Sequence, residues 1–358
     1  MRKIDKFKIG SKPKTAIEDT IKRESLNGRI STAMTGNLAS ERLPSIFDAK
    51  EITERDKALL KEVKEWDVIL GIDRRNKPVI LSNFETRLIY ALSFEISKEL
   101  TTSSDVKSKV KNALSKGNPI KRTILVSELS KLIFGSKKKT YKDKIFNGLL
   151  KLSKLRQIVT ITKENGAKIR LTAPLILIGE TYEVLSEDSN TDTIEIIYGS
   201  TFFHRLEERY AVITPLLFEV WRKNGRGTDL FSTLLSAILS VYWQFKTASI
   251  AAEKRVKREL KGKQYTKEQV EEAISQAKRE ALSYELNVSS IKNRVPTDYQ
   301  SSREMKKKFW KDLNNAIEGF KEADLITDAV IHRGARGQEK VTFILSETYN
   351  NTDKQLKS

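Results

Sequence analysis

The sequence contains no cysteine and only two histidines among its 358 residues. The absence of cysteine excludes disulfides, Cys-ligated zinc and a cysteine nucleophile. Each histidine, His204 and His332, is followed directly by Arg. Neither belongs to the His-x-His motif of rolling-circle initiators and relaxases or to the His-x-x-Arg motif of tyrosine recombinases. No G-x-x-x-x-G-K-[ST] segment occurs either, which excludes a P-loop.

Long apolar runs are also missing. A membrane-spanning helix needs roughly 18 apolar residues. The nearest candidate, Leu230 to Trp243, is shorter and is interrupted by Ser232, Ser236 and Ser240, which favours a buried helix. The N-terminal segment lacks the apolar stretch of a secretory signal. We therefore expect a cytoplasmic protein with no membrane partner.

What the sequence has in excess is positive charge. Lys and Arg number 66 against 47 Asp and Glu, a net charge of +19. Nucleic acid is the commonest partner that neutralises such a surplus, because its phosphates accept Lys and Arg along a continuous track. The alternative is a basic protein without that role.

One pattern occurs twice, in Ser136–Thr172 and in Ser302–Leu345. Each copy is a helix rich in Lys and Arg, followed by two short strands joined by a turn. In the first copy, Asn165-Gly166 separates the strands Ile158–Lys163 and Lys168–Thr172, and Asn-Gly tolerates the positive φ angles of a tight hairpin. A basic helix followed by a β-hairpin is typical of a winged-helix DNA-binding domain.

Each of these helices has an apolar side and a polar side. The apolar stripes are Tyr141, Ile145, Leu149 and Leu152 in the first, and Met305, Phe309, Leu313, Ile317 and Phe320 in the second. A helix of this kind can lie in the DNA major groove, with cations on phosphates and polar side chains on base edges. Arg in a hairpin can reach the minor groove. The predicted DNA-binding residues are Lys137, Lys138, Lys139, Lys142, Lys144, Asn147, Arg170, Arg303, Lys306, Lys307, Lys308, Lys311, Asn314, Arg333 and Arg336. The alternative is that each helix is merely amphipathic and solvated.

Other elements follow from periodicity and capping signals. The predicted strands are Val68–Ile72, Ile124–Val126, Leu175–Gly179 and Thr193–Gly199. The predicted helices are one opened by the capping box Ser82–Glu85, one capped by Ser127 and ended by Gly135, one at Thr228–Lys246, one that is opened by the capping box Thr266–Gln269 and runs to about Leu286, and a short one at Leu286–Val295.

The predicted fold class is α+β, mainly helical, with two winged-helix domains in tandem. The predicted divisions are a basic and partly flexible extension at 1–65, a first winged-helix domain at 66–212, a second at 213–347 and a disordered tail at 348–358.

The order of elements resembles the plasmid replication initiators that contain two winged-helix domains and bind directly repeated origin sequences, the iterons. Four segments carry the resemblance: SNFETRLIYALSFEI, ILVSELSKLIF with TYKDKIFNGLLKL and QIVTI, TIEIIYGSTFFHRLEERYAVIT, and FWKDLNNAIEGFKEADLIT with VTFILS. The likeness covers roughly Trp66 to Ser346. The chain departs from the simplest members in its basic N-terminal extension and in a charged helical insertion at Ala251–Glu280.

The resemblance implies a sequence-specific, double-stranded DNA-binding protein that initiates plasmid replication by binding origin repeats and opening adjacent duplex. It also implies homodimers, host helicase or initiator proteins as partners, no cofactor and no covalent chemistry. A winged-helix transcription regulator, including an autorepressor, is the first alternative. A metal-dependent nuclease or recombinase is another, since Asp and Glu are plentiful. A single-strand or RNA binder is the last.

Overall fold

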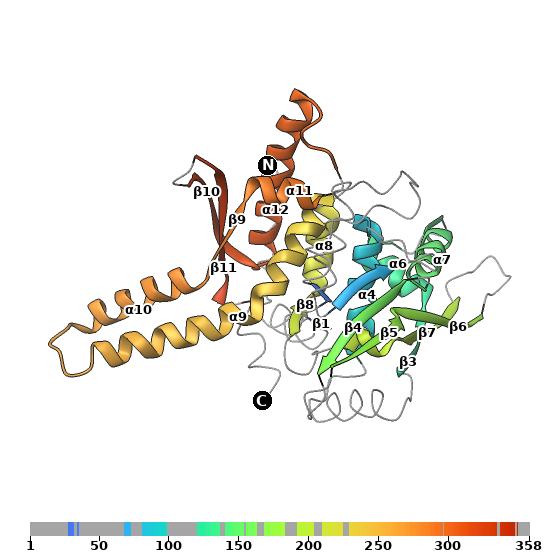
Figure 1. The fold of residues 1–358 in the computed structure, drawn as a ribbon, viewed down its shortest axis with the longest axis horizontal. Helices are drawn as coiled ribbons and strands as arrows, with labels where there is room; N and C mark the ends of the chain where they lie inside the picture. Colours follow the sequence, from blue (N-terminus) through green and yellow to red (C-terminus); the bar gives the residue numbers. More distant parts are fainter. Residues whose placement is uncertain are drawn as a thin grey trace, which may run out of the picture.

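The computed structural model describes residues 28–31, 34–35, 68–72, 81–98, 120–136, 140–153, 155–162, 168–182, 192–203, 210–224, 229–295, 297–334, 337–347 and 349. Over these residues the fold is α+β and mainly helical, with small antiparallel sheets (Figure 1). Two units of the same element order lie on either side of a shared helical core. One paired-helix arm extends away from them.

The C-terminal unit begins with strand β9 (Ser283–Asn287) and continues through helices α11 (Val288–Arg294) and α12 (Arg303–Glu322) into the hairpin β10 (Ile326–Arg333) and β11 (Glu339–Leu345). The sheet order is β10–β11–β9, so the last strand returns to pair with the first. The helix and hairpin predicted for this part of the sequence are confirmed. The strand β9 was not predicted, and the helix expected at Leu286–Val295 begins only at Val288.

The N-terminal unit repeats that order with an insertion. It runs from β3 (Ile120–Leu125) through α6 (Val126–Phe134) and α7 (Thr140–Ser153), and it ends in the hairpin β6 (Ile176–Tyr182) and β7 (Thr193–Tyr198). Its sheet order is β3–β7–β6, equivalent to β9–β11–β10. The insertion is the hairpin β4 (Arg156–Thr162) and β5 (Lys168–Pro174), which pairs with β2 (Val68–Ile72) in a separate sheet.

This topology corrects the sequence analysis. The hairpin predicted to follow α7 as its wing exists, as β4 and β5, but the strand that precedes α6 does not pair with it. That strand, β3, pairs with β7 along its whole length, from Ile120 opposite Tyr198 to Leu125 opposite Thr193. The hairpin that shares a sheet with β3 is therefore β6–β7.

A single continuous hydrophobic core joins the two units. Helix α4 (Asn83–Ser97) is buried along nearly its whole length, and α8 (Pro215–Asn224) and the first half of α9 (Asp229–Glu259) pack around it. Strand β1 (Gly28–Ser31), in the extension predicted to be partly flexible, pairs with β8 (Tyr210–Ile213). Tyr349, in the predicted tail, is also buried, and its hydroxyl donates to the carbonyl of Val212.

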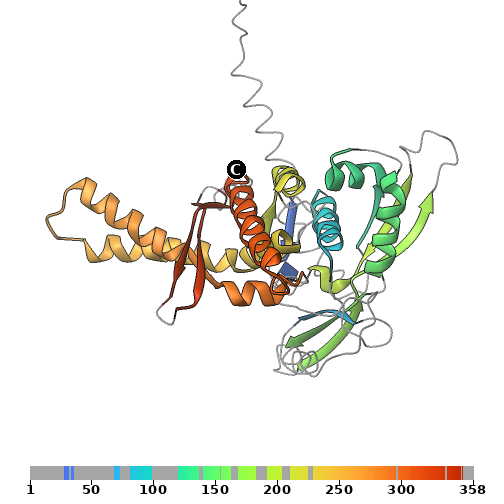
Figure 2. The same ribbon diagram turned by 90° about the horizontal axis from the view of Figure 1, so that it is seen from above.

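The arm consists of the second half of α9 and the antiparallel helix α10 (Lys267–Ala281), and it extends from the body in both views (Figures 1 and 2). Small apolar residues hold the two helices together: Ala252, Val256 and Ala277 form a cluster separate from the main core. The helical insertion is thus confirmed, but α9 is longer than predicted because charged pairs such as Lys257–Glu253 (2.6 Å) continue the helix beyond its apolar part.

Helix ends follow the capping signals in three of four cases. The capping boxes at Ser82 and Thr266 form, and Gly135 ends α6 with φ +79° while its N–H donates to the carbonyl of Lys131 (2.9 Å). The prediction that Ser127 caps α6 is wrong. The helix begins one residue before it, at Val126, because β3 leads directly into the helix through Leu125, which makes no side-chain cap.

Candidate nucleic-acid interface

Helix α12 is fixed to the core by one apolar face. Ser302 caps its first turn by accepting from the N–H of Met305 (3.1 Å), and Phe309, Leu313 and Phe320 are completely buried. At the other end, Lys223 of α8 donates to Glu322 (2.8 Å). The opposite face of the helix is consequently held in a defined orientation and lies in solvent.

That opposite face carries unpaired positive charge. Arg303, Lys307 and Lys311 recur every fourth residue and are all exposed. Among the residues that the structure describes, none forms an ion pair with these three or with Lys306. Exposed Asn314 continues the same line one turn further. We call Arg303, Lys306, Lys307, Lys311 and Asn314 the α12 ridge.

Lys308 is the exception among the predicted cations of α12. Its ammonium group pairs with the buried carboxylate of Asp312 one turn away, which also accepts from the hydroxyl of Tyr299 (2.9 Å). Burial and the neighbouring Asp312 raise the pKa of Tyr299, so this hydroxyl stays protonated as a donor. Lys308 therefore stabilises the start of the helix, and its charge is largely neutralised.

The hairpin β10–β11 lies beside α12 in both views (Figures 1 and 2). Arg333, at the end of β10, is exposed, and Gly337 in the turn has φ +70°. Arg336 lies outside the described residues. The hairpin is joined to the rest of its sheet by Glu285 of β9, whose carboxylate contacts Lys340 (2.5 Å). The hydrogen bond from Lys340 lowers the pKa of Glu285, which keeps this contact charged.

His332 lies within the same sheet, rather than at the hairpin tip. Its Nε2 is 3.0 Å from the hydroxyl of Thr342 and 3.3 Å from the carboxylate of Glu285. These contacts connect His332 of β10 to β11 and β9, so the side chain has a structural role in the sheet. Asn315, by contrast, was missed by the sequence analysis although it is exposed on α12 next to Asn314. Its position outside the apolar stripe of the helix was the available signal.

The basic helix of the N-terminal unit differs from α12. Lys142 pairs with Asp192 (2.9 Å), a residue only 1% exposed at the base of β7, and Lys151 pairs with Glu85 of α4 (3.2 Å). Lys144 is exposed but lies over the rings of Phe84 and Phe134. Of the predicted residues on α7, Asn147 alone is exposed on the outer face without an ion pair or a ring contact among the described residues.

The remaining predicted residues are not brought to this helix. Lys137, Lys138 and Lys139 lie outside the described residues. Arg170 is on β5 and pairs across the sheet with Thr160 of β4, so it belongs to the inserted hairpin and not to β6–β7. The segment that connects β6 to β7 carries Glu183, Glu187 and Asp188 in sequence, which is unfavourable for phosphate. Among the predicted helix residues that the structure describes, the exposed cations without an ion pair or ring contact therefore lie on α12.

Within the described ranges, no group of three or more His, Cys, Asp or Glu side chains is placed to hold a metal ion. No helix in the part of the chain that the structure describes is long and apolar enough to cross a membrane.

Comparisons with known proteins give structural neighbours alone. No family model and no curated protein matches the chain. Among solved structures, the chain is similar to domains 2–3 of RctB, with a TM-score of 0.38 and 11% identity over 89% of this chain and 98% of that one. A selenomethionine form of the same two domains gives 0.35 and 9% over 88% and 99%. At TM-scores this low the likeness carries no functional argument.

Proposed function

We propose that the protein binds double-stranded DNA with α12 in the major groove and the β10–β11 hairpin beside it, in the manner of a winged helix. The observation that carries this proposal is the α12 ridge, an exposed line of unpaired cations on a helix whose other face is buried. A helix with its side chains is about 10–12 Å across, and the major groove is about 12 Å wide. The order strand, helix, helix, hairpin supports the same reading.

In this arrangement the residues divide by role. Arg303, Lys306, Lys307 and Lys311 contact phosphates and set the position of the helix, which gives affinity without sequence preference. Asn314 presents an amide that can pair with adenine in the major groove. Arg333 contacts the backbone or minor groove next to the site. The N-terminal unit, with its paired lysines and acidic β6–β7 connection, contributes less to phosphate binding.

The biological role that we propose is initiation of plasmid replication. The protein binds repeated origin sites, and several bound copies promote opening of the adjacent duplex for a host helicase. It performs no covalent chemistry and needs no cofactor. A transcription regulator would use the same surface, so the arrangement of target sites separates the two roles. Direct repeats beside an AT-rich segment favour initiation, whereas a single inverted repeat over a promoter favours regulation.

The test is selection of bound duplexes from a random DNA library, first with the unaltered protein and then with Asn314→Ala and Lys307→Ala. We expect the unaltered protein to enrich one defined motif. Asn314→Ala should relax preference at one position, at a cost of about 1–3 kcal/mol for the preferred base, while Lys307→Ala should weaken binding equally for all sequences. Recovery of no motif would refute specific recognition, and identical profiles for both variants would remove Asn314 from the base contacts.

A further inference from the structure

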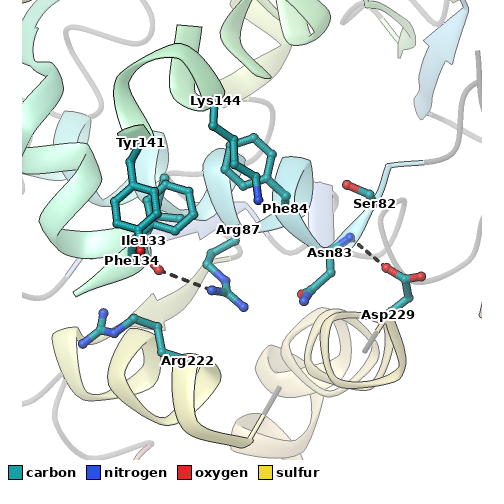
Figure 3. A pocket seen from close by; sticks show the side chains of 10 residues that line it. All are labelled: Ser82, Asn83, Phe84, Arg87, Ile133, Phe134, Tyr141, Lys144, Arg222 and Asp229. Carbon is teal, nitrogen blue, oxygen red and sulfur yellow. Dashed lines mark hydrogen bonds between the residues drawn. The ribbon is translucent and has the colours of Figure 1, made fainter. Parts of the chain in front are cut away.

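A cavity of about 540 Å³ lies where the N-terminal unit meets the helices α8 and α9 (Figure 3). Its walls come from the start of α4, the end of α6 and the start of α7 on one side, and from α8 and α9 on the other. Small-molecule sites in proteins commonly have volumes of this order. The α12 ridge contributes no residue to this wall.

Arg87 is the central side chain of the cavity. It extends from α4 between the two walls in Figure 3 and is 9% exposed. One of its terminal nitrogens donates to the carbonyl of Ile133 (3.3 Å), but its Nε has no hydrogen-bond partner among the described residues. Burial, and then repulsion from Arg222, lowers the pKa of Arg87 to about 10. Burying a charged guanidinium with an unused N–H donor costs free energy unless an anion accepts a hydrogen bond from that donor.

Two further cations line the cavity together with Arg87. Arg222 of α8 donates to the carbonyl of Leu132 (2.6 Å), and Lys144 of α7 lines the opposite edge. No ion pair joins Arg87, Arg222 or Lys144 to a carboxylate within the described residues. Asp229 is the acidic residue among the described residues of the wall, and it accepts from the backbone N–H of Asn83 (2.9 Å). Positive charge in the wall therefore exceeds negative charge.

A purely structural role explains part of this arrangement. The carbonyls of Leu132 and Ile133 are at the C-terminal end of α6, where cations are favourable, and each arginine satisfies one of them. That role uses one nitrogen of each guanidinium. It does not account for the free Nε of Arg87, nor for an open cavity at the point where two guanidiniums repel one another.

Aromatic rings form the rest of the wall. Phe134 stacks on Tyr141 with ring centroids 4.1 Å apart, and Phe84 stacks on Phe134 at 5.8 Å. Lys144 places its ammonium group 5.1 Å from the centre of the Phe84 ring. The wall thus combines three cations with a flat apolar surface, which suits a ligand that carries an anionic group on an apolar or aromatic body.

We propose that this cavity binds the phosphate group of a small phosphomonoester, with Arg87, Arg222 and Lys144 as the phosphate ligands and the stacked rings against the rest of the molecule. Phosphate is preferred over carboxylate because its three oxygens can accept from three cations at once. Since the walls belong to both sides of the junction, the bound ligand also stabilises the packing of the N-terminal unit on α8 and α9. This site is independent of the proposed DNA-binding function.

The test is isothermal titration of the full chain without DNA, using inorganic phosphate and AMP at concentrations up to about 10 mM and constant ionic strength. We expect saturable binding of one molecule per chain for both probes, tighter for AMP. Lys144→Met keeps the apolar stem and should raise Kd at least tenfold, about 1.4 kcal/mol. Arg222→Gln should do the same. Lys131→Met removes an exposed cation of α6 outside the cavity and should leave Kd unchanged.

Three results would overturn the proposal. The first is the absence of saturable binding for both probes. The second is an equal loss in Lys144→Met and Lys131→Met, which would indicate general attraction to a basic surface. The third is a Lys144→Met variant that binds phosphate normally but duplex DNA weakly, which would assign this lysine to the DNA interface. Thermal unfolding of each variant verifies that the fold is retained.

Discussion

Replacement of Arg303, Lys307 and Lys311 with Ala is the sharpest test of the α12 ridge. All three side chains are exposed and have no ion-pair partner in the described part of the chain, so their removal breaks no internal contact. Ala is also the best helix former, which favours retention of α12. Any change in DNA binding therefore reports lost contacts with DNA and not loss of fold.

The magnitude follows from counterion release. Each phosphate contact to duplex DNA contributes about 0.9 to the slope of log K against log salt concentration. If all three residues contact phosphate, the slope of the variant is shallower by about 2.7. Over a fourfold rise in salt, the unaltered protein should then lose about 40-fold more affinity than the variant, because four raised to that power is about 40. The difference is well above the error of a binding titration.

The assay is fluorescence anisotropy of a labelled duplex over a series of salt concentrations. The matched control is Lys254→Ala, Lys261→Ala and Lys263→Ala combined, which removes three exposed and unpaired cations from the arm. We expect the control to change the slope by far less. Equal changes in both triple variants would refute the reasoning, since binding would then depend on net charge and not on the α12 ridge. An unchanged slope in the α12 variant would remove these residues from the interface.

Three further predictions concern the fold. Phe309→Ala should reduce the free energy of unfolding by about 3–5 kcal/mol in a denaturant titration, because its ring is completely buried on the core-facing side of α12. A loss below about 1 kcal/mol would contradict that packing. Gly135→Ala should cost about 1–2 kcal/mol in the same experiment, since its φ of +79° is unfavourable for a residue with a Cβ; an unchanged midpoint would contradict the backbone geometry. Hydrogen bonds from Lys257 and then Lys278 lower the pKa of Glu253 to about 2, so the stability that this carboxylate contributes is present above about pH 4.5 and is lost as the pH falls toward 2. NMR titration of the Glu253 carboxyl should show this low midpoint, and Lys257→Met should raise it; a midpoint that the substitution leaves in place would exclude Lys257 as the cause.

Local patterns in the sequence predicted the helices well. The stripe Phe309, Leu313, Ile317 predicts the buried face of α12, and that face decides which residues form the ridge. The capping boxes at Ser82 and Thr266 predict helix starts because both partners lie within four residues. Where the information is local and the period is regular, physical rules recover both the element and its orientation.

Pairing between distant strands was not predictable in the same way. The Asn-Gly turn correctly indicates that β4 and β5 pair, but it carries no information on which hairpin β3 joins. That choice depends on β7, about seventy residues further on. Strand β1 has only four residues, and its partner β8 lies far along the chain. The role of Lys142 was likewise hidden, because Asp192 neutralises it only in the folded chain. Asp312, by contrast, follows Lys308 by four residues on the same helix, so this pair was readable from the sequence.

The arm has a practical consequence that follows from its shape. Its outer end is built from exposed residues around Gly262, while its inner end is tied to the body by contacts of Glu347 with Lys278 (3.3 Å) and Ser249 (3.0 Å). Because the sequence has no cysteine, Lys263→Cys introduces a unique thiol at the tip. A dye attached there reports the distance between the tip and a labelled DNA end by energy transfer, and helix α9 connects the arm to the core without a break.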